Sequence, residues 1–445
     1  MIADPVPMSC DDLPIYRLPH ERLGLFYAPG YLAMIAPERV GPFEHRLRSR
    51  SATGVAGELR AHARGALATH RRQLGRRYAP TCLTLYLHDG CSLHCTYCVS
   101  DPSPRPRRRL ELEDVRAAAA AVIENCLARG MPFTVVCHGG GEPTLEPSFL
   151  FRILDELEAM AEARGVAIWR YLATNGAMPA PVARRIAHRF DLVGLSCDGP
   201  EDVQAVQRPL RRGGSSTPQV EATADAIRAV GTPLHVRTTV LPAKVDRLPE
   251  IAEYLCSRLG PREIAAEPVY VGGRATARDV PAPEDAERMV DAFEAAEAVA
   301  ISHGVAWTTS GSRPGEVHAT YCNVDRDVLQ LVPGGAAVAC FKAQDATSAR
   351  RAGLAVGARV GARFELDQRA VARVRERTAE WPACRACFNR FHCVRSCPDV
   401  CPAVGTAASD GFRCRFQRLL TLRRLTSIAA ERGAGDGTVE EGITL

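Results

Sequence analysis

The chain has 445 residues, of which 46% are hydrophobic and 24% charged, and its formal net charge is +5 at pH 7. This composition is typical of a globular protein of two or three domains and excludes a nucleic-acid-binding tail or a polybasic membrane anchor. No stretch approaches the roughly 18 apolar residues of a membrane span, and the start MIADPVPMSCDD has no signal-peptide pattern, so we expect a cytoplasmic protein with neither nucleic acid nor membrane as partner.

Residues 1–80 are predicted to form a small α+β region. The segment YRLPHERLGLFYAPGYLAMI favours two or three strands broken by Pro and Gly, and Arg- and Ala-rich helical sequence follows it. No catalytic signature occurs in this region.

Six short apolar segments in residues 81–310 are predicted to be buried strands. They are 81–88, 133–138, 167–174, 191–197, 234–240 and 264–270. The helical patterns of this region are at 112–129, 147–164, 179–189, 217–230, 246–258 and 283–304. Strands that alternate with helices predict a parallel β/α sheet, closed or partly closed, with chemistry at the carboxyl ends of the strands.

The cysteines indicate metal or cluster ligation, because 17 of them occur in a long chain without a secretory signal. Cys91, Cys95 and Cys98 follow the first strand with the spacing C-x3-C-x2-C. Three thiolates would leave one iron of a four-iron cluster with an open coordination position. A structural zinc site is the alternative, but zinc normally needs a fourth ligand, and only His88 or His94 is near in sequence.

This spacing, with an aromatic residue directly before the third cysteine, resembles the signature of the radical S-adenosylmethionine (SAM) superfamily. The resemblance implies that the open iron chelates the amino and carboxylate groups of SAM. It also implies that an electron from the cluster splits SAM into methionine and a 5′-deoxyadenosyl radical. The α/β fold expected for residues 81–310 is then a partial (β/α)6 TIM-like barrel.

Residues at later strand ends resemble those that line the SAM pocket in this superfamily. Glu142 belongs to a match to the GGE motif, which contacts the SAM amino group, and Arg208 matches an arginine near the SAM carboxylate. Each position alone could be a turn or a strand-end cap, but their order along the chain favours the pocket. The expected SAM-binding residues are Tyr97, Gly140, Gly141, Glu142, Asn175, Ser196 and Arg208.

A second cysteine group lies in residues 311–432, where VLQLVPGGAAVAC predicts a hairpin and RFQRLLTLRRLTSIAAER a helix. Its spacing, which includes Gly335, resembles the SPASM domain that holds two auxiliary four-iron clusters. The seven cysteines are Cys322, Cys340, Cys384, Cys387, Cys393, Cys397 and Cys414. A zinc ribbon could use Cys384 and Cys387 but would leave Cys322 and Cys340 without a role. Residues 433–445 lack periodicity and are predicted to form a mobile tail.

The resemblance implies three [4Fe-4S] clusters in all. The outer auxiliary cluster would take Cys384, Cys387, Cys393 and Cys414, and the inner one Cys322, Cys340 and Cys397. The inner cluster then has an open iron unless Cys401 or His318 completes it. The isolated cysteines Cys10, Cys82, Cys126, Cys137, Cys197 and Cys256 are predicted to be buried thiols.

Radical SAM enzymes with SPASM domains mostly modify peptides or proteins. Sulfatase maturases carry an acidic base directly after the cysteine equivalent to Cys340, and Phe341 in that position argues against this subfamily. Residues 267–274 are similar to the last-strand motif of ribosomal-peptide (RiPP) maturases, which install thioether, carbon-carbon or related crosslinks. The resemblance therefore implies a precursor peptide or protein as substrate and a flavodoxin- or ferredoxin-type reductant.

Several alternatives stay open at this stage. A SPASM enzyme that oxidises a small-molecule metabolite is one, and a non-catalytic iron-sulfur electron-transfer or scaffold protein is another. Residues 1–80 could capture a precursor's leader by strand addition or cap the bottom of the barrel. The arginines of 105–109 could meet acidic residues of a precursor or belong to an exposed loop.

Overall fold

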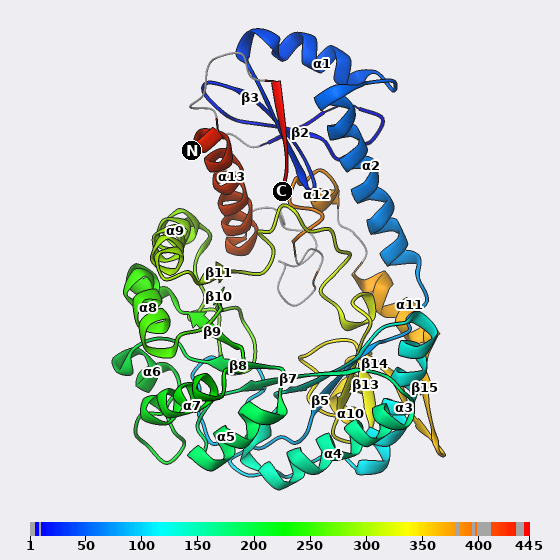
Figure 1. The fold of residues 1–445 in the computed structure, drawn as a ribbon, viewed down its shortest axis with the longest axis vertical. Coiled ribbons are helices and arrows are strands. Elements are labelled where there is room, and N and C mark those ends of the chain that lie inside the picture. The colour runs from blue at the N-terminus through cyan, green and yellow to red at the C-terminus, as the bar shows by residue number, and fades with distance from the viewer. Residues whose placement is uncertain (1–4, 9, 379–381, 394–396, 398–410, 433–439) are drawn as a thin grey trace.

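The computed structural model describes residues 5–8, 10–378, 382–393, 397, 411–432 and 440–445. Within these residues the chain forms a large, curved, mostly parallel sheet with helices on its convex side and a separate small sheet above it (Figure 1). No helix in the described residues is long and apolar enough to cross a membrane.

Seven consecutive parallel strands form the barrel-like part of the large sheet, and each pairs with its neighbour in chain order. They are β5 (Cys82–Tyr86), β6 (Phe133–His138), β7 (Ile168–Thr174), β8 (Leu192–Ser196), β9 (Leu234–Val240), β10 (Glu263–Pro268) and β11 (Ala306–Thr308). The first six confirm the predicted strands. Strand β11 was not predicted, because it is only three residues long.

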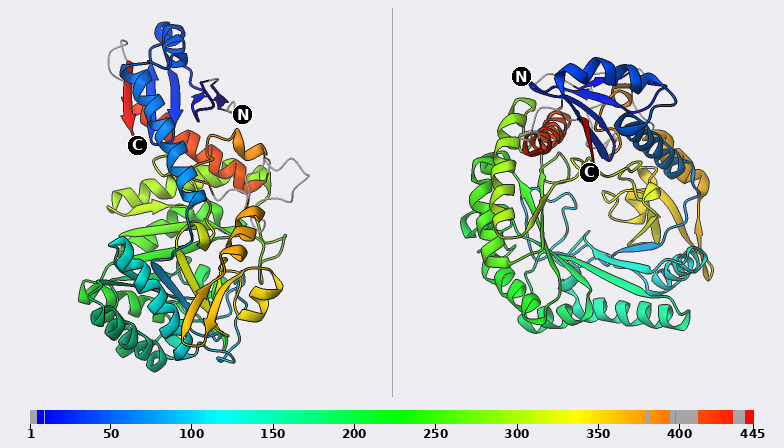
Figure 2. Two further views of the ribbon diagram at one scale, coloured as in Figure 1. Left: turned by 90° about the vertical axis from the view of Figure 1, so that its right-hand side faces the viewer. Right: turned by 45° about the horizontal axis from the view of Figure 1, so that its top comes forward.

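The helices cover the outer face of this sheet (Figure 2). They are α3 (Leu112–Arg129), α4 (Pro147–Ala163), α5 (Ala180–Arg189), α6 (Glu201–Gln207), α7 (Thr217–Val230), α8 (Leu248–Tyr254) and α9 (Ala286–Ser302). In β6 the fully buried Phe133, Val135 and Cys137 alternate with partly exposed residues. This alternation directs the apolar side chains to the helices, where each fully buried large side chain contributes about 1.5–3 kcal/mol, and the other side chains to the inside of the barrel.

The large sheet continues on the other side of β5. Strand β12 (Val328–Val332) pairs parallel with β5, and β13 (Ala336–Val338) completes the predicted hairpin. Strands β14 (Ala355–Val360) and β15 (Arg363–Leu366) extend it. The sheet therefore runs across residue 310, where we predicted a domain boundary. The remaining helices are α10 (Ala346–Arg351), α11 (Gln368–Arg377), α12 (Pro382–Arg385) and α13 (Phe412–Arg432).

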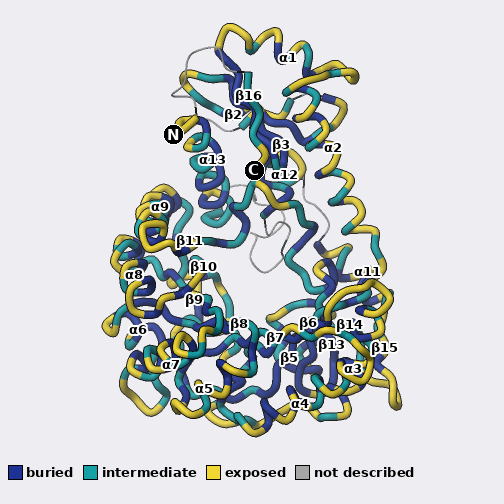
Figure 3. The backbone as a smooth tube through the Cα atoms, in the orientation of Figure 1, coloured by how far each residue is buried: buried dark blue, intermediate teal, exposed yellow. Residues whose placement is uncertain are grey.

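The N-terminal region is α+β, as predicted. Its strands are β1 (Val6–Pro7), β2 (Tyr16–Leu18), β3 (Gly24–Ala28) and β4 (Tyr31–Ile35), and its helices are α1 (Val40–Arg48) and α2 (Gly54–Gly75). Tyr16 and Tyr27 pack against Phe388 and against apolar residues of α13. The region thus lies on the cysteine-rich C-terminal part of the chain and not on the helices around the barrel (Figures 1 and 3).

The prediction of a mobile tail is wrong for residues 440–444. They form β16 (Glu440–Thr444), which pairs antiparallel with β4 over five residue pairs. Arg39 and Arg46 both form ion pairs with Glu440, at 2.8 and 2.6 Å. Residues 433–439 lie outside the described part of the chain. The tail was mispredicted because its order comes from pairing with a strand about 400 positions away. A local sequence pattern cannot indicate such a distant partner.

Candidate functional site

The loop that carries Cys91, Cys95 and Cys98 begins at the carboxyl end of β5 and is held by the loop after β6. Gly141 N donates to His88 O at 2.9 Å, and Glu142 N donates to Gly90 O at 2.7 Å. A Cβ on Gly141 would stand 2.1 Å from Gly90 O, so only glycine allows this approach. The GGE residues therefore meet the first cysteine group at the carboxyl edge of the sheet, as their order in the sequence predicted.

The three thiols of this loop are neighbours. Burial raises the pKa of Cys91 to about 12, and the charges of Glu142 and of the Cys95 and Cys98 thiols add to the shift. Within the described residues, no three His, Cys, Asp or Glu side chains converge on a position for a single metal ion. The thiolates of a cubane cluster bind different irons, so they need not converge on one position.

Glu142 is 4% exposed, and its carboxylate accepts four hydrogen bonds. Oε1 accepts from Thr144 N (3.1 Å), Thr144 Oγ1 (2.8 Å) and Thr174 Oγ1 (2.7 Å), and Oε2 accepts from Asn175 N at 2.7 Å. Burial raises its pKa, and these hydrogen bonds oppose the rise. The carboxylate thus joins the ends of β6 and β7, and Oε2 keeps acceptor capacity for one more donor.

Asn175 and Ser196 lie at the carboxyl ends of the next two strands. Asn175 Nδ2 donates to Cys91 Sγ at 3.5 Å, which links β7 directly to the cysteine loop. Ser196 ends β8 and pairs in register with Arg237 of β9. Gly140 has a positive φ of 98°, and a Cβ on it would stand 3.1 Å from the Tyr86 ring. The predicted pocket residues thus surround one edge of the sheet.

Tyr97 and Arg208 are bound to each other. Arg208 Nη1 donates to the Tyr97 hydroxyl at 2.7 Å, and that hydroxyl donates to Asp198 Oδ2 at 2.6 Å. Asp198 is 1% exposed and also accepts from Gln207 Nε2 at 2.8 Å. Arg208 is 8% exposed, and its Nε is buried without a hydrogen-bond partner. A buried guanidinium with an unused donor fits a carboxylate, which is the group that the family resemblance implies here.

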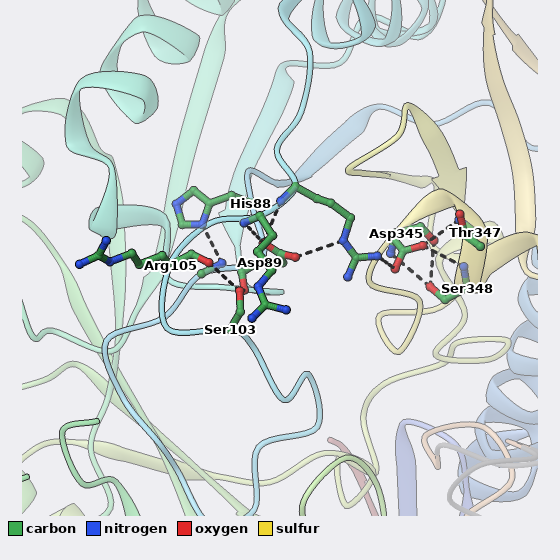
Figure 4. A network of polar contacts seen from close by, with 10 residues as sticks. His88, Asp89, Ser103, Arg105, Asp345, Thr347 and Ser348 are labelled. Atoms are coloured by element: carbon green, nitrogen blue, oxygen red, sulfur yellow. Dashed lines mark hydrogen bonds and ion pairs between the residues drawn. The ribbon is translucent and has the colours of Figure 1, made fainter. Parts of the chain in front are cut away.

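The inner cysteine group also comes together. Burial raises the pKa of Cys322 to about 12, and the Cys340 and Cys397 thiols are close enough to contribute. The segment after Cys340 is tied to the first cysteine loop by Arg108, which binds Asp89 Oδ2 at 3.1 Å and Asp345 Oδ2 at 2.5 Å (Figure 4). Asp345 in turn caps α10 through Thr347 N and Ser348 N. One arginine therefore connects the two cysteine sites.

The outer cysteine group lies under the N-terminal region. The pKa of Cys387 is raised to about 11, first by burial, and the Cys414 and Cys384 thiols contribute. Cys393 Sγ donates to Gln417 Oε1 of α13 at 2.9 Å. Tyr16 of β2 donates its hydroxyl to Cys387 O at 3.2 Å.

Two residues were considered as a further ligand of the inner group. His318 packs edge-on against Tyr321, with ring centroids 4.9 Å apart, and lines the barrel cavity. Cys401 lies outside the described residues. The completion of this group stays a prediction.

Five of the six isolated cysteines are buried, as predicted, whereas Cys82 is partly exposed. The buried five are Cys10, Cys126, Cys137, Cys197 and Cys256.

A cavity of about 490 Å³ occupies the inside of the barrel. Its wall includes Tyr171, Arg237 and Glu267 from the strands and Arg313 and Tyr321 from the following loop. Arg237 has no carboxylate partner within the described residues, whereas Glu267 accepts from Ser310 N and Oγ at 2.7 and 2.6 Å. Such a wall of aromatic rings and charges suits a polar, peptide-like ligand better than a purely apolar one.

Sequence reasoning assigned no role to three residues that support this site. Asp198 fixes Tyr97, Arg237 enters the cavity, and Arg274 donates from Nη1 to Cys95 O at 3.0 Å and from its backbone N to Cys98 O at 3.0 Å. Arg274 belongs to the motif of residues 267–274, and Asp198 lies two residues after the predicted pocket residue Ser196. Arg237 had no such signal, because a charged residue in a half-buried strand points either to solvent or into the barrel.

Comparison with known proteins supports this description. Residues 85–255 match the Radical SAM superfamily. A cysteine-type anaerobic sulfatase-maturating enzyme of Clostridium perfringens (strain ATCC 13124) is 25% identical over 167 residues, which are 37% of this chain and 45% of that protein. The chain thus matches less than half the length of this curated relative.

Solved structures share the fold. Native anSMEcpe with bound AdoMet superposes with a TM-score of 0.60 at 16% identity, over 79% of this chain and 99% of that one. The same protein with AdoMet and the Cp18Cys peptide gives a TM-score of 0.59, at 16% identity over 78% of this chain and 98% of that one. Streptococcus suis SuiB bound to S-adenosylmethionine gives 0.50 at 14% identity, over 81% and 82% of the two chains.

Proposed function

Because the chain carries a radical SAM domain over residues 85–255, we propose that it cleaves SAM reductively and uses the resulting radical to modify a peptide or protein. The observation that carries the proposal is the meeting of three groups at one edge of the sheet. The three neighbouring thiols can hold a cluster. The Glu142 carboxylate can bind an ammonium group, and the unsatisfied Nε of Arg208 can donate to a carboxylate.

In this proposal Cys91, Cys95 and Cys98 hold a [4Fe-4S] cluster, which when bound supplies the electron that splits SAM into methionine and a 5′-deoxyadenosyl radical. The protein's own residues orient SAM. Tyr97 and Asp198 hold Arg208 in place, and Asn175 donates to the Cys91 sulfur. A hydrogen bond to a ligand sulfur stabilises the negative charge of that sulfur and shifts the reduction potential of the bound cluster.

The two auxiliary clusters belong to the same proposal. Cys384, Cys387, Cys393 and Cys414 would hold the outer cluster completely, and Cys322, Cys340 and Cys397 would hold the inner one. The thiols that influence one another's pKa values fall into these same groups. An inner cluster with three cysteines would keep an open iron for a substrate thiolate, unless Cys401 or His318 completes it.

We infer that the substrate is a precursor peptide that receives a thioether, carbon-carbon or related crosslink. Three observations support this. The barrel cavity is polar and large enough for peptide side chains. Phe341, 39% exposed, takes the place of the acidic base of sulfatase maturases. Structures with a similar fold contain AdoMet with a bound peptide.

The N-terminal sheet is the proposed site for a precursor's leader. Strand addition needs an unpaired strand edge, and the outer edge of β4 is already taken by β16. The sheet order leaves β1 and β16 as the outermost described strands, and β16 is the longer of the two. A leader strand would therefore add to β16.

The test uses anaerobically reconstituted, reduced protein with SAM. The wild type is expected to release 5′-deoxyadenosine, and Arg208→Lys to bind SAM about tenfold or more weakly, because lysine keeps the charge but loses the Nε donor and the planar fork. Arg212→Lys is the matched control on the same loop and should bind SAM normally. If cluster-loaded wild type released no 5′-deoxyadenosine, the proposal would be wrong.

A further inference from the structure

Two arginine-bearing loops pack directly on the first cysteine loop. Cys91 N donates to Ser103 O at 2.9 Å, which fastens residues 101–109, and His94 N donates to Pro209 O at 2.8 Å, which fastens residues 207–214. His94 and Thr96 of the cysteine loop are exposed between them. The two loops therefore surround the place where the first cysteine loop reaches the protein surface.

The charges of these loops do not balance. Arg108 is paired with Asp89 and Asp345, and Arg109 with Glu146. Three further arginines are exposed and have no carboxylate partner within the described residues: Arg105, Arg107 and Arg212. Among the residues that the structure describes, the guanidinium of Arg211 hydrogen-bonds to the carbonyls of Cys91 and Pro102 and to the His94 ring, and it has no carboxylate partner. The surface around the cysteine loop is thus positive, although the whole chain carries only +5.

This positive surface is held in place. Asp89 Oδ1 accepts from the backbone N–H groups of Arg107 and Arg108 at 2.7 and 3.1 Å. Ser103 Oγ donates to Arg105 O at 2.6 Å, while the Arg105 side chain is directed away from Asp89 (Figure 4). Asp89 is therefore occupied by the backbone and by Arg108, and Asp101, the acidic residue of the 101–109 loop, pairs with Arg274 at 2.5 Å. The remaining guanidinium groups face solvent on a fixed loop.

The position of the arginines distinguishes between two acidic partners. The cavity that would hold a substrate is lined by β7, β9, β10 and residues 310–326, and no residue of the two loops contributes to its wall. A peptide side chain held in that cavity would contact neither Arg105 nor Arg212, because neither lines it. A protein that delivers electrons, in contrast, has to approach the first cluster closely, and here it would meet these arginines.

We propose, on the basis of the proposed function, that Arg105, Arg107 and Arg212 form the docking surface for a small acidic electron-transfer protein of the flavodoxin or ferredoxin type. The donor loses one electron and the first cluster gains it, and no bond forms or breaks in this step. Charge complementarity raises the association rate and is screened by salt, because the Debye length is about 10 Å at 0.1 M.

The test compares the holoenzyme with the variant Arg105→Glu/Arg107→Glu/Arg212→Glu. The probe is a bacterial flavodoxin reduced by NADPH and flavodoxin reductase. Binding and the rate of first-cluster reduction are measured at low and at about 0.5 M salt. At low salt the variant should bind flavodoxin at least about tenfold more weakly and be reduced correspondingly more slowly, and at high salt the two proteins should converge.

The matched control carries the same charge change on exposed arginines of α2 and α5, Arg64→Glu/Arg71→Glu/Arg184→Glu, and should behave as wild type. Dithionite, a small reductant, should drive equal SAM cleavage in all three proteins, and absence of cleavage in wild type would count against the proposed function alone. Equal flavodoxin binding by variant and wild type would overturn the docking surface. Slower SAM cleavage by the variant than by wild type under dithionite would assign these arginines to the SAM site instead and overturn it as well.

Discussion

Glu142 is buried with four hydrogen-bond donors on its carboxylate, two of which, Thr174 Oγ1 and Asn175 N, come from the carboxyl end of β7. Without a bound cation, burial raises its pKa above the ordinary value of 4.5. A raised carboxyl pKa means that ionisation of this group opposes folding. This penalty grows as pH rises from the unfolded pKa to the folded pKa and is complete above it. An ammonium group bound at Oε2 would lower the pKa of Glu142, since it favours the charged form of the carboxylate.

We therefore predict that SAM binding through Glu142 depends on pH. Affinity should fall as pH drops through the raised pKa of the free protein, in a window that lies above 4.5. Glu142→Gln should weaken SAM binding by about tenfold or more at pH 7.5 and flatten this dependence. Titration calorimetry of the cluster-loaded protein between pH 5.5 and 8 would measure both effects.

Glu146→Gln is the control for this experiment, because its carboxylate lies on the same loop and pairs with Arg109 at 2.9 Å. It should leave the affinity and the pH profile unchanged. Equal losses of SAM affinity in both variants would mean that Glu142 only maintains the loop structure and does not bind the SAM ammonium.

At the scale of elements, the loop after β6 can bind the cysteine loop only because it carries Gly141. Gly141→Ala would place a Cβ 2.1 Å from Gly90 O, a backbone atom that cannot move without displacing Cys91. We predict that this variant loses the first cluster and about a third of its iron. Iron analysis after reconstitution checks this. Gly139→Ala, whose nearest contact is 3.3 Å, should retain most of the iron.

Strand β16 depends on a close approach of the same kind. A Cβ on Gly442 would overlap the Tyr31 hydroxyl, which is held by the Glu58 carboxylate and by stacking of the Tyr31 ring on His62. Gly442→Ala should therefore release β16 from β4 at a cost of about 1–3 kcal/mol. Hydrogen exchange should then accelerate at Tyr31–Ile35. Gly65→Ala on α2, which meets nothing within 4 Å, should leave this exchange unchanged. Protection of β4 that persisted in Gly442→Ala would contradict the pairing seen here.

At the scale of the whole molecule, the three cysteine groups lie in one continuous body. Arg108 connects the first group to the segment of Cys340, and Tyr16 connects the N-terminal region to Cys387. The reconstituted chain should hold about twelve irons in three cubane clusters. Changing Cys91, Cys95 and Cys98 together to Ala should remove about a third of them and leave the rest, measured by iron analysis and Mössbauer spectroscopy. Stoichiometric zinc, or unchanged iron in this variant, would disprove the assignment.

The sequence alone determined the parts of this protein that depend on local pattern. Helices α3 and α7 have the predicted bounds, and β5 to β10 were expected from short apolar runs, because periodicity is set by neighbours in the chain. The cysteine spacings and the order of Glu142, Asn175 and Arg208 also lie within single segments, so their meeting at the carboxyl edge of a parallel sheet could be predicted.

Only the tertiary structure decided the contacts between distant segments. Short strands pair with partners that are far away in sequence or that no local pattern indicates. Examples are β16 with β4, β12 with β5, and the seventh strand β11 with β10. The same holds for Asp198, which fixes Tyr97 from about 100 residues away, and for Arg237, whose strand could have turned either face to the barrel. A strand of three to five residues carries too little period to specify its partner, so the packing of the whole chain selects it.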